Sequence, residues 1–235
     1  MTAWVTLLQM FFGTISADLR APLERDPAAR GPLDVVLSYP GFHALLAHRI
    51  IHPLYRAGVP LLPRFLANVA RFFTGIDIHP GATLGKGIFI DHGTGVVIGE
   101  TAEVGDGCTI YQGVTLGGTS LSRGKRHPTL GRNVTVGVNS SVLGAIVLGD
   151  SAKVGGGSVV VKDVPANATV VGVPARIVAQ DGKPVRAVST RPQVEMPDPN
   201  ADAIVRLQRR IDLLERRLTE IESGDAEEEA WSWVI

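Results

Sequence analysis

The chain has 235 residues, with 23 basic and 23 acidic side chains and a formal net charge of zero at pH 7. This length fits one or two domains. The neutral balance, without a basic stripe interleaved with aromatic residues, gives no electrostatic reason to expect a nucleic-acid partner. The single cysteine, Cys108, excludes an intramolecular disulfide framework and a zinc site built from clustered cysteines. Glycine is abundant, at 27 residues, and its placement becomes regular in the middle of the chain.

The N-terminal segment is apolar, but its pattern is that of a helix. It lacks the positively charged start and the small-residue cleavage pattern of a signal peptide. Apolar residues recur at intervals of three and four, which predicts one buried helical stripe formed by Val5, Leu8, Phe12, Ile15 and Leu19. No run reaches the roughly eighteen apolar residues that a membrane span needs. We therefore expect a cytoplasmic protein.

Residues 1–74 are predicted to form an N-terminal helical region. Six prolines interrupt it, at positions 22, 27, 32, 40, 53 and 60, and leave helices near residues 3–20, 33–38, 41–57 and 61–74. Within the third helix, His48 and His52 are four residues apart, which is metal-ligand spacing on a helix. Since no acidic third ligand lies nearby, we interpret them as polar residues on a packed helix that ends at Pro53.

From Ile78 to Val160 the chain carries a hexapeptide repeat. Ten of the twelve intervals between its thirteen aliphatic residues are six, at positions 78, 84, 90, 98, 104, 110, 116, 130, 136, 142, 148, 154 and 160. Glycine directly follows eight of the thirteen. A small or branched residue lies four positions after many of them, as at Ala102, Cys108, Val114, Val134, Ser140, Ala152 and Ser158. This period is typical of a parallel β-helix.

Each hexad is expected to supply one short strand and one corner. The aliphatic and the small residue would point inward, while glycine would relax the backbone where it turns. Three hexads close one coil of a triangular prism, so residues eighteen apart should stack and thirteen hexads give about four coils. Cys108 occupies an inward small-residue position, so we expect a buried and unreactive thiol.

Two insertions break the period, and insertions in repeat proteins form loops on one face, often the binding face. The interval from residue 90 to 98 is eight and contains His92, and the interval from 116 to 130 is fourteen and contains His127. Asp77 precedes His92 by fifteen residues, slightly less than one coil, so the two could meet. The carboxylate would then orient the ring and leave its other nitrogen free as a general base. The alternative is a histidine that only shapes its loop.

Six motifs in the repeat region carry a family resemblance. They are Asp77-Ile-His-Pro80, Asp91-His-Gly-Thr-Gly95, Val97-Ile-Gly-Glu-Thr-Ala102, Gln112-Gly-Val-Thr-Leu-Gly-Gly-Thr119, Lys125-Arg-His-Pro128 and Gly172-Val-Pro-Ala-Arg176. In this order they resemble serine O-acetyltransferase, the first enzyme of cysteine biosynthesis, over two thirds of the chain from about Arg25 to Ile177. The resemblance implies a mainly β fold, a left-handed parallel β-helix with a short N-terminal helical domain. The sequence pattern described below predicts a C-terminal helix as well.

The resemblance also implies the chemistry, which is transfer of the acetyl group of acetyl-CoA to the hydroxyl of L-serine, giving O-acetyl-L-serine and CoA. His92 matches the general base and Asp77 the residue that orients it. Four residues match those that hold the amino acid, with acids facing its ammonium and an arginine its carboxylate: Asp26, Asp91, Arg126 and His127. Backbone groups around Gly118 and Val138 match the pantetheine contacts, and no metal is expected. Backbone N–H groups near Gly117 and Gly118 are candidate donors to the oxyanion.

Assembly and partners follow from the same resemblance. The active site of this family lies between neighbouring prisms of a homotrimer. Longer members join two trimers through an extended N-terminal helical domain, whereas fewer than eighty residues precede the repeats here. A C-terminal isoleucine in this family inserts into O-acetylserine sulfhydrylase (cysteine synthase), and residues 223–235 form an acidic and apolar tail that ends in Ile235. Cysteine is implied as a feedback inhibitor.

The β-helix domain is expected to span residues 75–178, followed by a proline-rich linker over 179–200. A helix is predicted over 201–222, because aliphatic residues alternate at intervals of three and four: Ile204, Leu207, Ile211, Leu214, Leu218 and Ile221. Arg210 and Glu215 are five apart, which fits parallel pairing with another copy. The alternative is an amphipathic helix packed on its own subunit.

Three other functions remain open. A related hexapeptide acyltransferase would modify a sugar or another small acceptor, although Asp26, Arg126 and His127 favour an amino acid. A metalloenzyme such as a γ-type carbonic anhydrase would use His79, His92 and His127, whose spacing does not match that family. A non-catalytic regulatory scaffold for cysteine synthase would not need an intact base.

Overall fold

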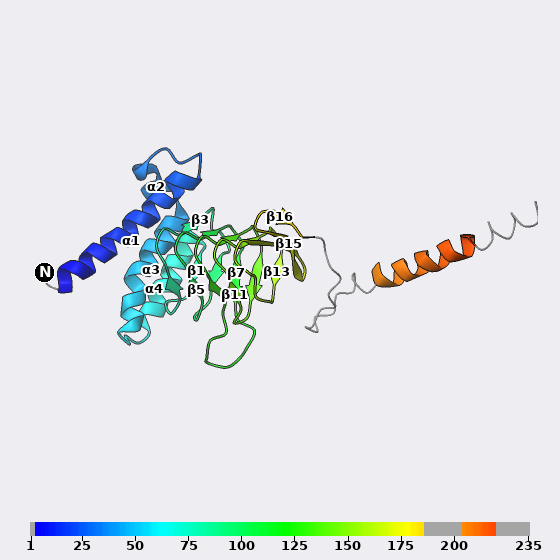
Figure 1. The fold of residues 1–235 in the computed structure, drawn as a ribbon. Coiled ribbons are helices and arrows are strands. Elements are labelled where there is room, and N and C mark those ends of the chain that lie inside the picture. Colours follow the sequence, from blue (N-terminus) through cyan, green and yellow to red (C-terminus); the bar gives the residue numbers. More distant parts are fainter. Residues whose placement is uncertain (1–2, 186–203, 220–235) are drawn as a thin grey trace, which may run out of the picture. The chain divides into compact units, whose positions relative to one another are not determined.

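The structure, a computed structural model, describes residues 3–185 and 204–219. Two compact units, Met1–Ser189 and Thr190–Ile235, are described separately. Within the first unit, four helices gather at one end of a triangular prism of short strands, and a long loop projects from its side (Figure 1). None of the helices in the described residues is both long and apolar enough to span a bilayer.

The helices are α1 (Ala3–Arg25), α2 (Pro32–Ser38), α3 (Pro40–Arg56) and α4 (Leu62–Thr74). The expected breaks at Pro22 and Pro53 are wrong, since α1 and α3 each continue for three residues past these prolines. Each proline removes one i→i−4 hydrogen bond from the last turn of its helix, and the helix continues past it. The chain leaves α4 through Gly75, which has a left-handed φ of 71° and donates its N–H to the Arg71 carbonyl.

The predicted buried stripe on α1 is wrong at Phe12, whose side chain is 63% exposed. The side chains of Val5 and Leu8 lie outside the described residues. The inward face of α1 is instead marked by Asp18 and Ala21, which are 2% and 1% exposed.

Thirteen short parallel strands carry the hexads. They are β1 (Asp77–Ile78), β2 (Thr83–Leu84), β3 (Phe89–Ile90), β4 (Val97–Ile98), β5 (Glu103–Val104), β6 (Thr109–Ile110), β7 (Thr115–Gly117), β8 (Thr129–Leu130), β9 (Thr135–Val136), β10 (Ser141–Leu143), β11 (Val147–Leu148), β12 (Lys153–Val154) and β13 (Val159–Val160). Every predicted aliphatic position is the second residue of its strand, and all but the partly buried Leu84 are fully buried. The hexapeptide prediction is therefore confirmed.

Every third strand stacks in register to form one face of the prism. Sheet A has the order β1-β4-β7-β10-β13, sheet B has β2-β5-β8-β11, and sheet C contains β3-β6-β9-β12. Ile98 pairs with Leu116, eighteen residues further on, as expected. Across the insertions the spacing grows to twenty for Ile78 with Ile98, and to twenty-six for Leu116 with Val142. Both insertions thus leave the ladder intact and bulge outside it.

The glycines after the aliphatic residues have a different role from the one predicted. Gly105, Gly131 and Gly137 do not have positive φ, and the left-handed turns fall at other residues. A Cβ on Gly105 would lie 2.5 Å from the carbonyl oxygen of Gly131, and one on Gly137 would lie 2.7 Å from the nitrogen of Gly156. These glycines therefore allow successive coils to approach closely, and the prediction that they relax a turn is wrong.

Sheet C continues past the repeats. β14 (Ala168–Gly172) pairs in parallel with β12, and then β15 (Ala175–Gln180) and β16 (Lys183–Pro184) follow as antiparallel strands. The last two strands occupy the segment in which the linker was predicted to begin at residue 179, so that boundary is too early. In the second unit, residues 204–219 form a helix in which every residue is exposed. Ile221, Glu222 and the tail lie outside the described residues.

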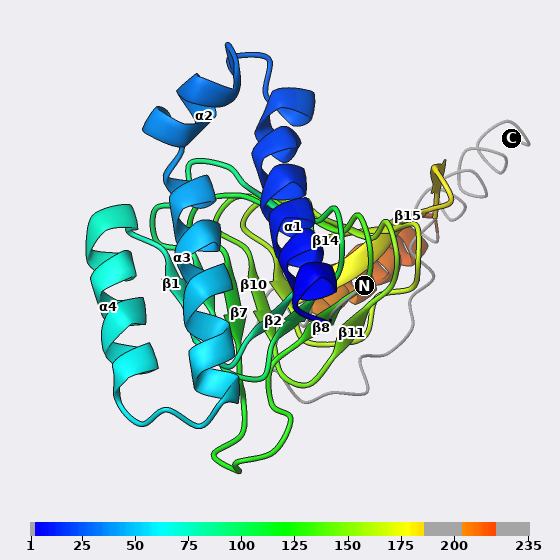
Figure 2. The same ribbon diagram turned by 90° about the vertical axis from the view of Figure 1, so that its left-hand side faces the viewer.

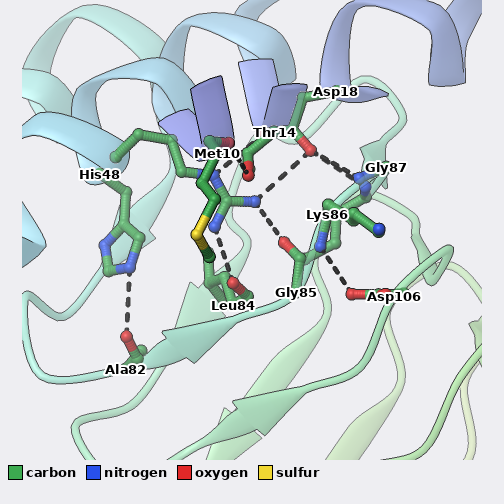
Figure 3. Close-up of polar contacts among 12 residues, drawn as sticks. Met10, Thr14, Asp18, His48, Ala82, Leu84, Gly85, Lys86, Gly87 and Asp106 are labelled. Atoms are coloured by element: carbon green, nitrogen blue, oxygen red, sulfur yellow. Dashed lines mark hydrogen bonds and ion pairs between the residues drawn. The ribbon is translucent and has the colours of Figure 1, made fainter. Parts of the chain in front are cut away.

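A buried ion pair joins the helices to the first coil (Figure 3). Arg49 Nε lies 3.0 Å from Asp18 Oδ2, and the guanidinium also donates to the carbonyls of Leu84 and Gly85. Asp18 Oδ1 accepts the N–H of Gly87 at 2.8 Å. Burial raises the pKa of Asp18 despite the charge of Arg49 beside it. The pair therefore fixes the docking of α1 and α3 at the cost of desolvating a carboxylate.

His48 and His52 also bond this first coil. His48 Nε2 lies 3.1 Å from the Ala82 carbonyl and His52 Nδ1 lies 2.8 Å from the Pro80 carbonyl, so each ring donates a proton to the backbone. Burial lowers the pKa of His48 to about 3, which keeps it neutral. Their interpretation as polar residues on a packed helix agrees with these contacts, but the helix ends at Arg56 and not at Pro53.

Candidate active site

Two clusters of polar side chains lie on the two edges of the prism that border sheet A. The edge where the chain passes from sheet C to sheet A carries the His92 corner, defined as Asp26, Tyr39, Asp91 and His92. The edge where the chain passes from sheet A to sheet B carries the Arg126 corner, defined as Tyr55, Glu100, Thr101, Arg126 and His127. The short insertion thus supplies Asp91 and His92 to the first cluster, and the long insertion supplies Arg126 and His127 to the second.

The short insertion presents His92 to solvent. The chain leaves β3 and turns through His92, which has a φ of 57° and a side chain that is 74% exposed. Such a left-handed backbone is uncommon for residues other than glycine, and asparagine, aspartate and histidine adopt it more often than the rest. Its Nε2 lies 4.0 Å from Asp91 Oδ1. The turn is packed on the core, because a Cβ on Gly93 would clash with the side chain of Ile76.

Asp26 reaches the His92 corner from the end of α1. Its Oδ2 accepts the hydroxyl of Tyr39 at 2.7 Å, and its Oδ1 accepts the N–H of Ala28 at 2.8 Å. These two bonds lower the pKa of Asp26, and the nearby His92 ring adds to the effect. The same bond to Asp26 raises the pKa of Tyr39 to about 12. The corner therefore holds an ionised carboxylate beside an exposed imidazole.

Asp77 does not contact His92 in this chain. Its Oδ2 lies 3.5 Å from Arg71 Nη1 on α4, and the described residues show no hydrogen bond or ion pair between Asp77 and His92. Its backbone N–H donates to Val96, at the end of the turn that contains His92. The structure therefore places Asp77 on β1, beside Val97 of β4, with its carboxylate turned to an arginine.

Thr101 anchors the returning end of the long insertion. Its Oγ1 accepts the backbone N–H groups of Arg126 and His127, each at 3.1 Å, and its carbonyl accepts Lys125 Nζ at 2.7 Å. The tip of the loop is free of the prism, with Leu121 fully exposed. The positions of Arg126 and His127 are therefore set by the prism and not by the loop.

The tautomer of His127 is fixed by the same residue. Its Nδ1 lies 3.2 Å from the backbone N–H of Thr101. A backbone N–H can only donate, so Nδ1 is unprotonated and the ring carries its proton on Nε2. Burial and the neighbouring Arg126 lower the pKa of His127, which keeps it neutral. The ring packs over Gly99, where any Cβ would collide with it. His127 is therefore a neutral hydrogen-bond donor.

Arg126 is held from one side by an acidic partner. Its Nη2 lies 2.5 Å from Glu100 Oε2, and the Tyr55 hydroxyl donates to Glu100 Oε1 at 3.1 Å. The bonds from Arg126 and Tyr55 lower the pKa of Glu100. Within the described part of the chain, Nε and Nη1 of Arg126 make no hydrogen bond. The second N–H of Nη2, together with Nη1 or Nε, is therefore available for a carboxylate in the two-pronged geometry that arginine favours.

The residues expected to contact CoA lie on the same two edges. Gly117 ends β7 and, with Gly118, leads into the long insertion beside the Arg126 corner. A Cβ on Gly118 would lie 3.1 Å from the Arg126 carbonyl oxygen, so this glycine lets the loop pass close to the arginine. Val138 is 38% exposed and lies between β9 and β10, on the edge of the His92 corner.

Comparison with known proteins settles the family. The model of the family described as "Serine acetyltransferase, N-terminal" matches residues 8–47. The serine acetyltransferase of Synechococcus elongatus is 53% identical over 217 residues, which cover 92% of this chain and 88% of that protein. The chain belongs to the serine acetyltransferase family.

Solved serine acetyltransferases share the fold. The Neisseria gonorrhoeae protein in complex with serine is 50% identical, with a TM-score of 0.69 over 72% of this chain and 69% of that chain. The Brucella abortus protein in complex with coenzyme A is 45% identical, with a TM-score of 0.71 over 72% and 68%. A serine acetyltransferase in complex with cysteine is 42% identical, with a TM-score of 0.72 over 73% and 67%. These relatives confirm the predicted left-handed β-helix.

Membership of the serine acetyltransferase family leaves two rival chemistries without support. His79 accepts the N–H of Gly81 on its Nδ1, and among the described residues no group of three or more histidine, cysteine, aspartate or glutamate side chains is placed to hold a metal. Cys108 is fully buried, and burial raises the pKa of its thiol to about 11. The expectation of a buried thiol is confirmed, and so high a pKa makes it a poor nucleophile.

Sequence reasoning missed the side chains that hold the site residues in place. Tyr39 lies between α2 and α3, and Tyr55 lies on α3, so no repeat or insertion pointed to them. Thr101 and Glu100 lie inside one of the serine acetyltransferase motifs, and their position directly after a hexad glycine was the available signal. Tyr39 bonds a residue thirteen positions away, and the contacts of the other three side chains span twenty-four to forty-five positions, which spacing alone does not reveal.

Proposed function

We propose that the chain transfers the acetyl group of acetyl-CoA to the hydroxyl of L-serine, giving O-acetyl-L-serine and CoA. The observation that carries this proposal is the pairing of unlike chemistry on the two corners. One corner has a carboxylate and an exposed imidazole, and the other has a guanidinium and a neutral imidazole donor. Together they match the ammonium, hydroxyl and carboxylate of a small amino acid. The relative bound to serine supports this acceptor over a sugar.

In the proposed reaction, His92 removes the proton from the serine hydroxyl as the oxygen attacks the thioester carbonyl. The tetrahedral intermediate then collapses, the bond from carbon to sulfur breaks, and the CoA sulfur leaves with a proton. Backbone N–H groups near Gly117 and Gly118 are candidate donors to the oxyanion. Asp77 is assigned the orienting role, which requires its carboxylate to leave Arg71.

Substrate binding is assigned to both corners. Asp26 and Asp91 would face the ammonium of serine, and Arg126 would bind its carboxylate. His127 would donate a hydrogen bond from its Nε2–H to the same carboxylate. The backbone around Gly118, with Gly117 and Val138, would contact acetyl-CoA, and the relative that holds coenzyme A supports this co-substrate. With acetyl-CoA as the donor, we expect a cytoplasmic enzyme without a bound metal.

One chain does not complete this site. The strand between the corners runs from Val96 to Gly99, which alone spans about 10 Å, whereas the groups of serine lie within a few ångströms of one another. The His92 corner must therefore meet the Arg126 corner of a second copy. A contact between two different corners can repeat between successive copies of a closed ring. We propose a homotrimer on the resemblance to serine O-acetyltransferase, and leave a dimer of trimers as a further step.

The direct test of the reaction is an assay of thiol release from acetyl-CoA. Serine should give rapid release, while sugars and amines of similar size should give little. Faster release with a sugar than with serine would favour the related hexapeptide acyltransferases.

The shared site predicts that two inactive variants rescue each other. His92→Ala and Arg126→Ala should each be nearly inactive, but co-expression in equal amounts should restore about one quarter of the wild-type sites, because random mixing pairs intact corners with that frequency. The matched control mixes His92→Ala with Asp26→Ala, which damage the same corner. That mixture should stay inactive, and equal recovery in both mixtures would contradict a site shared between copies.

Ile235 is proposed as the contact to O-acetylserine sulfhydrylase, and it lies outside the described residues. A peptide of the last ten residues should bind the sulfhydrylase from the same organism and compete with O-acetylserine, since a free carboxylate on a short apolar side chain is a recurrent recognition unit. Deleting Ile235 should abolish binding in a calorimetric titration and leave acetyl transfer unchanged. Equal affinity with and without Ile235 would defeat the proposal.

Cysteine is proposed as an inhibitor that binds in place of serine, because it carries the same ammonium and carboxylate. The relative in complex with cysteine supports this assignment.

A further inference from the structure

One face of α3 brings a tyrosine from the helical region to the Arg126 corner. His48, His52 and Tyr55 follow helical spacing and share this face, and both histidines bond backbone carbonyls of the first coil. Figure 2 shows α3 across the end of the prism, between α4 and α1. Tyr55 lies one turn after His52, and its hydroxyl donates to Glu100 Oε1 at 3.1 Å. The helix α3 thus supplies a hydrogen-bond donor to the Arg126 corner.

The ring of Tyr55 is held independently of its hydroxyl. It meets the His79 ring edge-on, with the ring centroids 5.7 Å apart. A Cβ on Gly81 would lie 3.1 Å from Tyr55 Cε1, so this glycine makes room for the ring. Burial and the bond to Glu100 raise the pKa of Tyr55, so the hydroxyl keeps its proton and remains a donor at neutral pH. Removing the hydroxyl alone should therefore leave the ring in place.

Glu100 is oriented by its hydrogen bonds more than by packing. Its side chain is 34% exposed and borders a cavity of about 240 Å³ that Tyr55 and Thr83 also line. Its Oε2 accepts Nη2 of Arg126, and its Oε1 accepts the tyrosine hydroxyl. A carboxylate that is free to turn would bring both oxygens to the guanidinium, since two parallel bonds are the favoured geometry for these groups. Tyr55 thus keeps one oxygen of Glu100 away from the arginine.

We propose that Tyr55 is a positioning residue for recognition of the acceptor's carboxylate. By binding Oε1 of Glu100, it limits Glu100 to one nitrogen of Arg126 and leaves a pair of guanidinium N–H groups open for the carboxylate of serine. The inference rests on the proposed function, in which Arg126 binds that carboxylate. It gives the helical region, and not only the repeats, a part in the choice of acceptor.

The test compares serine with L-serinamide, which keeps the hydroxyl and the amino group but has no carboxylate. In full-length Tyr55→Phe, Glu100 should turn to two nitrogens of Arg126, so KM for serine should rise about three- to tenfold, the effect of one hydrogen bond. The kcat for serine and both constants for serinamide should stay near wild type. The matched control is Tyr39→Phe at the His92 corner, where the hydroxyl bonds Asp26. It should weaken both acceptors alike, because both carry an ammonium.

A second background separates positioning from a merely structural role. In Glu100→Ala, adding Tyr55→Phe should not change KM for serine further, because the group that the hydroxyl orients is gone. An added loss in that background, or an equal loss for serine and serinamide in Tyr55→Phe alone, would overturn the inference.

Arg126→Ala separates this inference from the proposed function. It should bring the ratio of kcat/KM for serine to that for serinamide close to one. If it does so while Tyr55→Phe leaves KM for serine unchanged, the contact of Arg126 with the carboxylate stands and the role of Tyr55 is wrong. If the wild-type enzyme does not prefer serine to serinamide, the carboxylate contact itself fails, and the inference fails with it.

Discussion

Replacing His92 should lower kcat for acetyl transfer by about 10²–10⁴-fold, which is the usual contribution of a general base. The side chain is 74% exposed and its only described contact is the one to Asp91, so its removal should not disturb packing. Because His92 has a φ of 57°, the better variant is His92→Asn, since asparagine tolerates a left-handed backbone more readily than alanine. Turnover of acetyl-CoA with saturating serine measures the effect.

Two control variants accompany this prediction, one at Asp77 and one at another histidine. Asp77→Asn should cost less than His92→Asn, because it impairs only orientation, and its cost should be small if Arg71 retains the side chain. His43→Ala removes a half-buried histidine that bonds the Val36 carbonyl, and it should leave kcat unchanged. Turnover close to wild type in His92→Asn would remove the proposed mechanism.

The second large effect is on stability, at the ion pair between Asp18 and Arg49. Asp18→Ala should destabilise the fold by about 3–5 kcal/mol, the usual cost of leaving one buried charge without its partner. It also removes the acceptor for the Gly87 N–H. Because the side chain of Asp18 is 2% exposed, water cannot replace the lost carboxylate. Calorimetric melting at a fixed protein concentration measures the change.

Asp150→Ala is the matched control, since the chain repeats the same pairing at the surface. Arg132 bonds Asp150 through two nitrogens, at 3.0 and 2.7 Å, with both side chains well exposed. Solvent screens such a pair, so its loss should change the melting temperature little. Asp18→Asn keeps an oxygen acceptor, so its melting temperature should lie between those of Asp18→Ala and Asp150→Ala. Equal melting temperatures for Asp18→Ala and Asp150→Ala would show that burial does not decide the cost.

The strands were predictable because the hexad is a local pattern in the sequence. Each inward aliphatic residue marks one strand, and the two insertions mark the places where the six-residue spacing is interrupted. The reason for the hexad glycines was not predictable, since it is the approach of the next coil, eighteen or more residues away. Pro22 was misread because a proline can kink a helix or lie within it without ending it.

The site divides in the same way. The residues that would meet substrate carry chemical types that stand out in a repeat, as His92, His127 and Arg126 do. The contact between Asp77 and His92 was inferred from a spacing of fifteen, but spacing does not tell where a carboxylate points, and Arg71 comes from a helix outside the repeat. Thr101 was overlooked because its importance lies in which backbone groups it accepts.

Because Thr101 binds the backbone at the returning end of the long insertion, the positions of Arg126 and His127 do not depend on the length of the loop before them. Strand pairing resumes after the loop as if nothing had been inserted, with Leu116 beside Val142. Arg126 and His127 are hydrogen-bonded to Thr101 just before strand pairing resumes at β8. Residues 119–124 can therefore be lengthened, shortened or exchanged without moving either side chain. A loop of another length or sequence would therefore leave Arg126 and His127 at the same place on the prism.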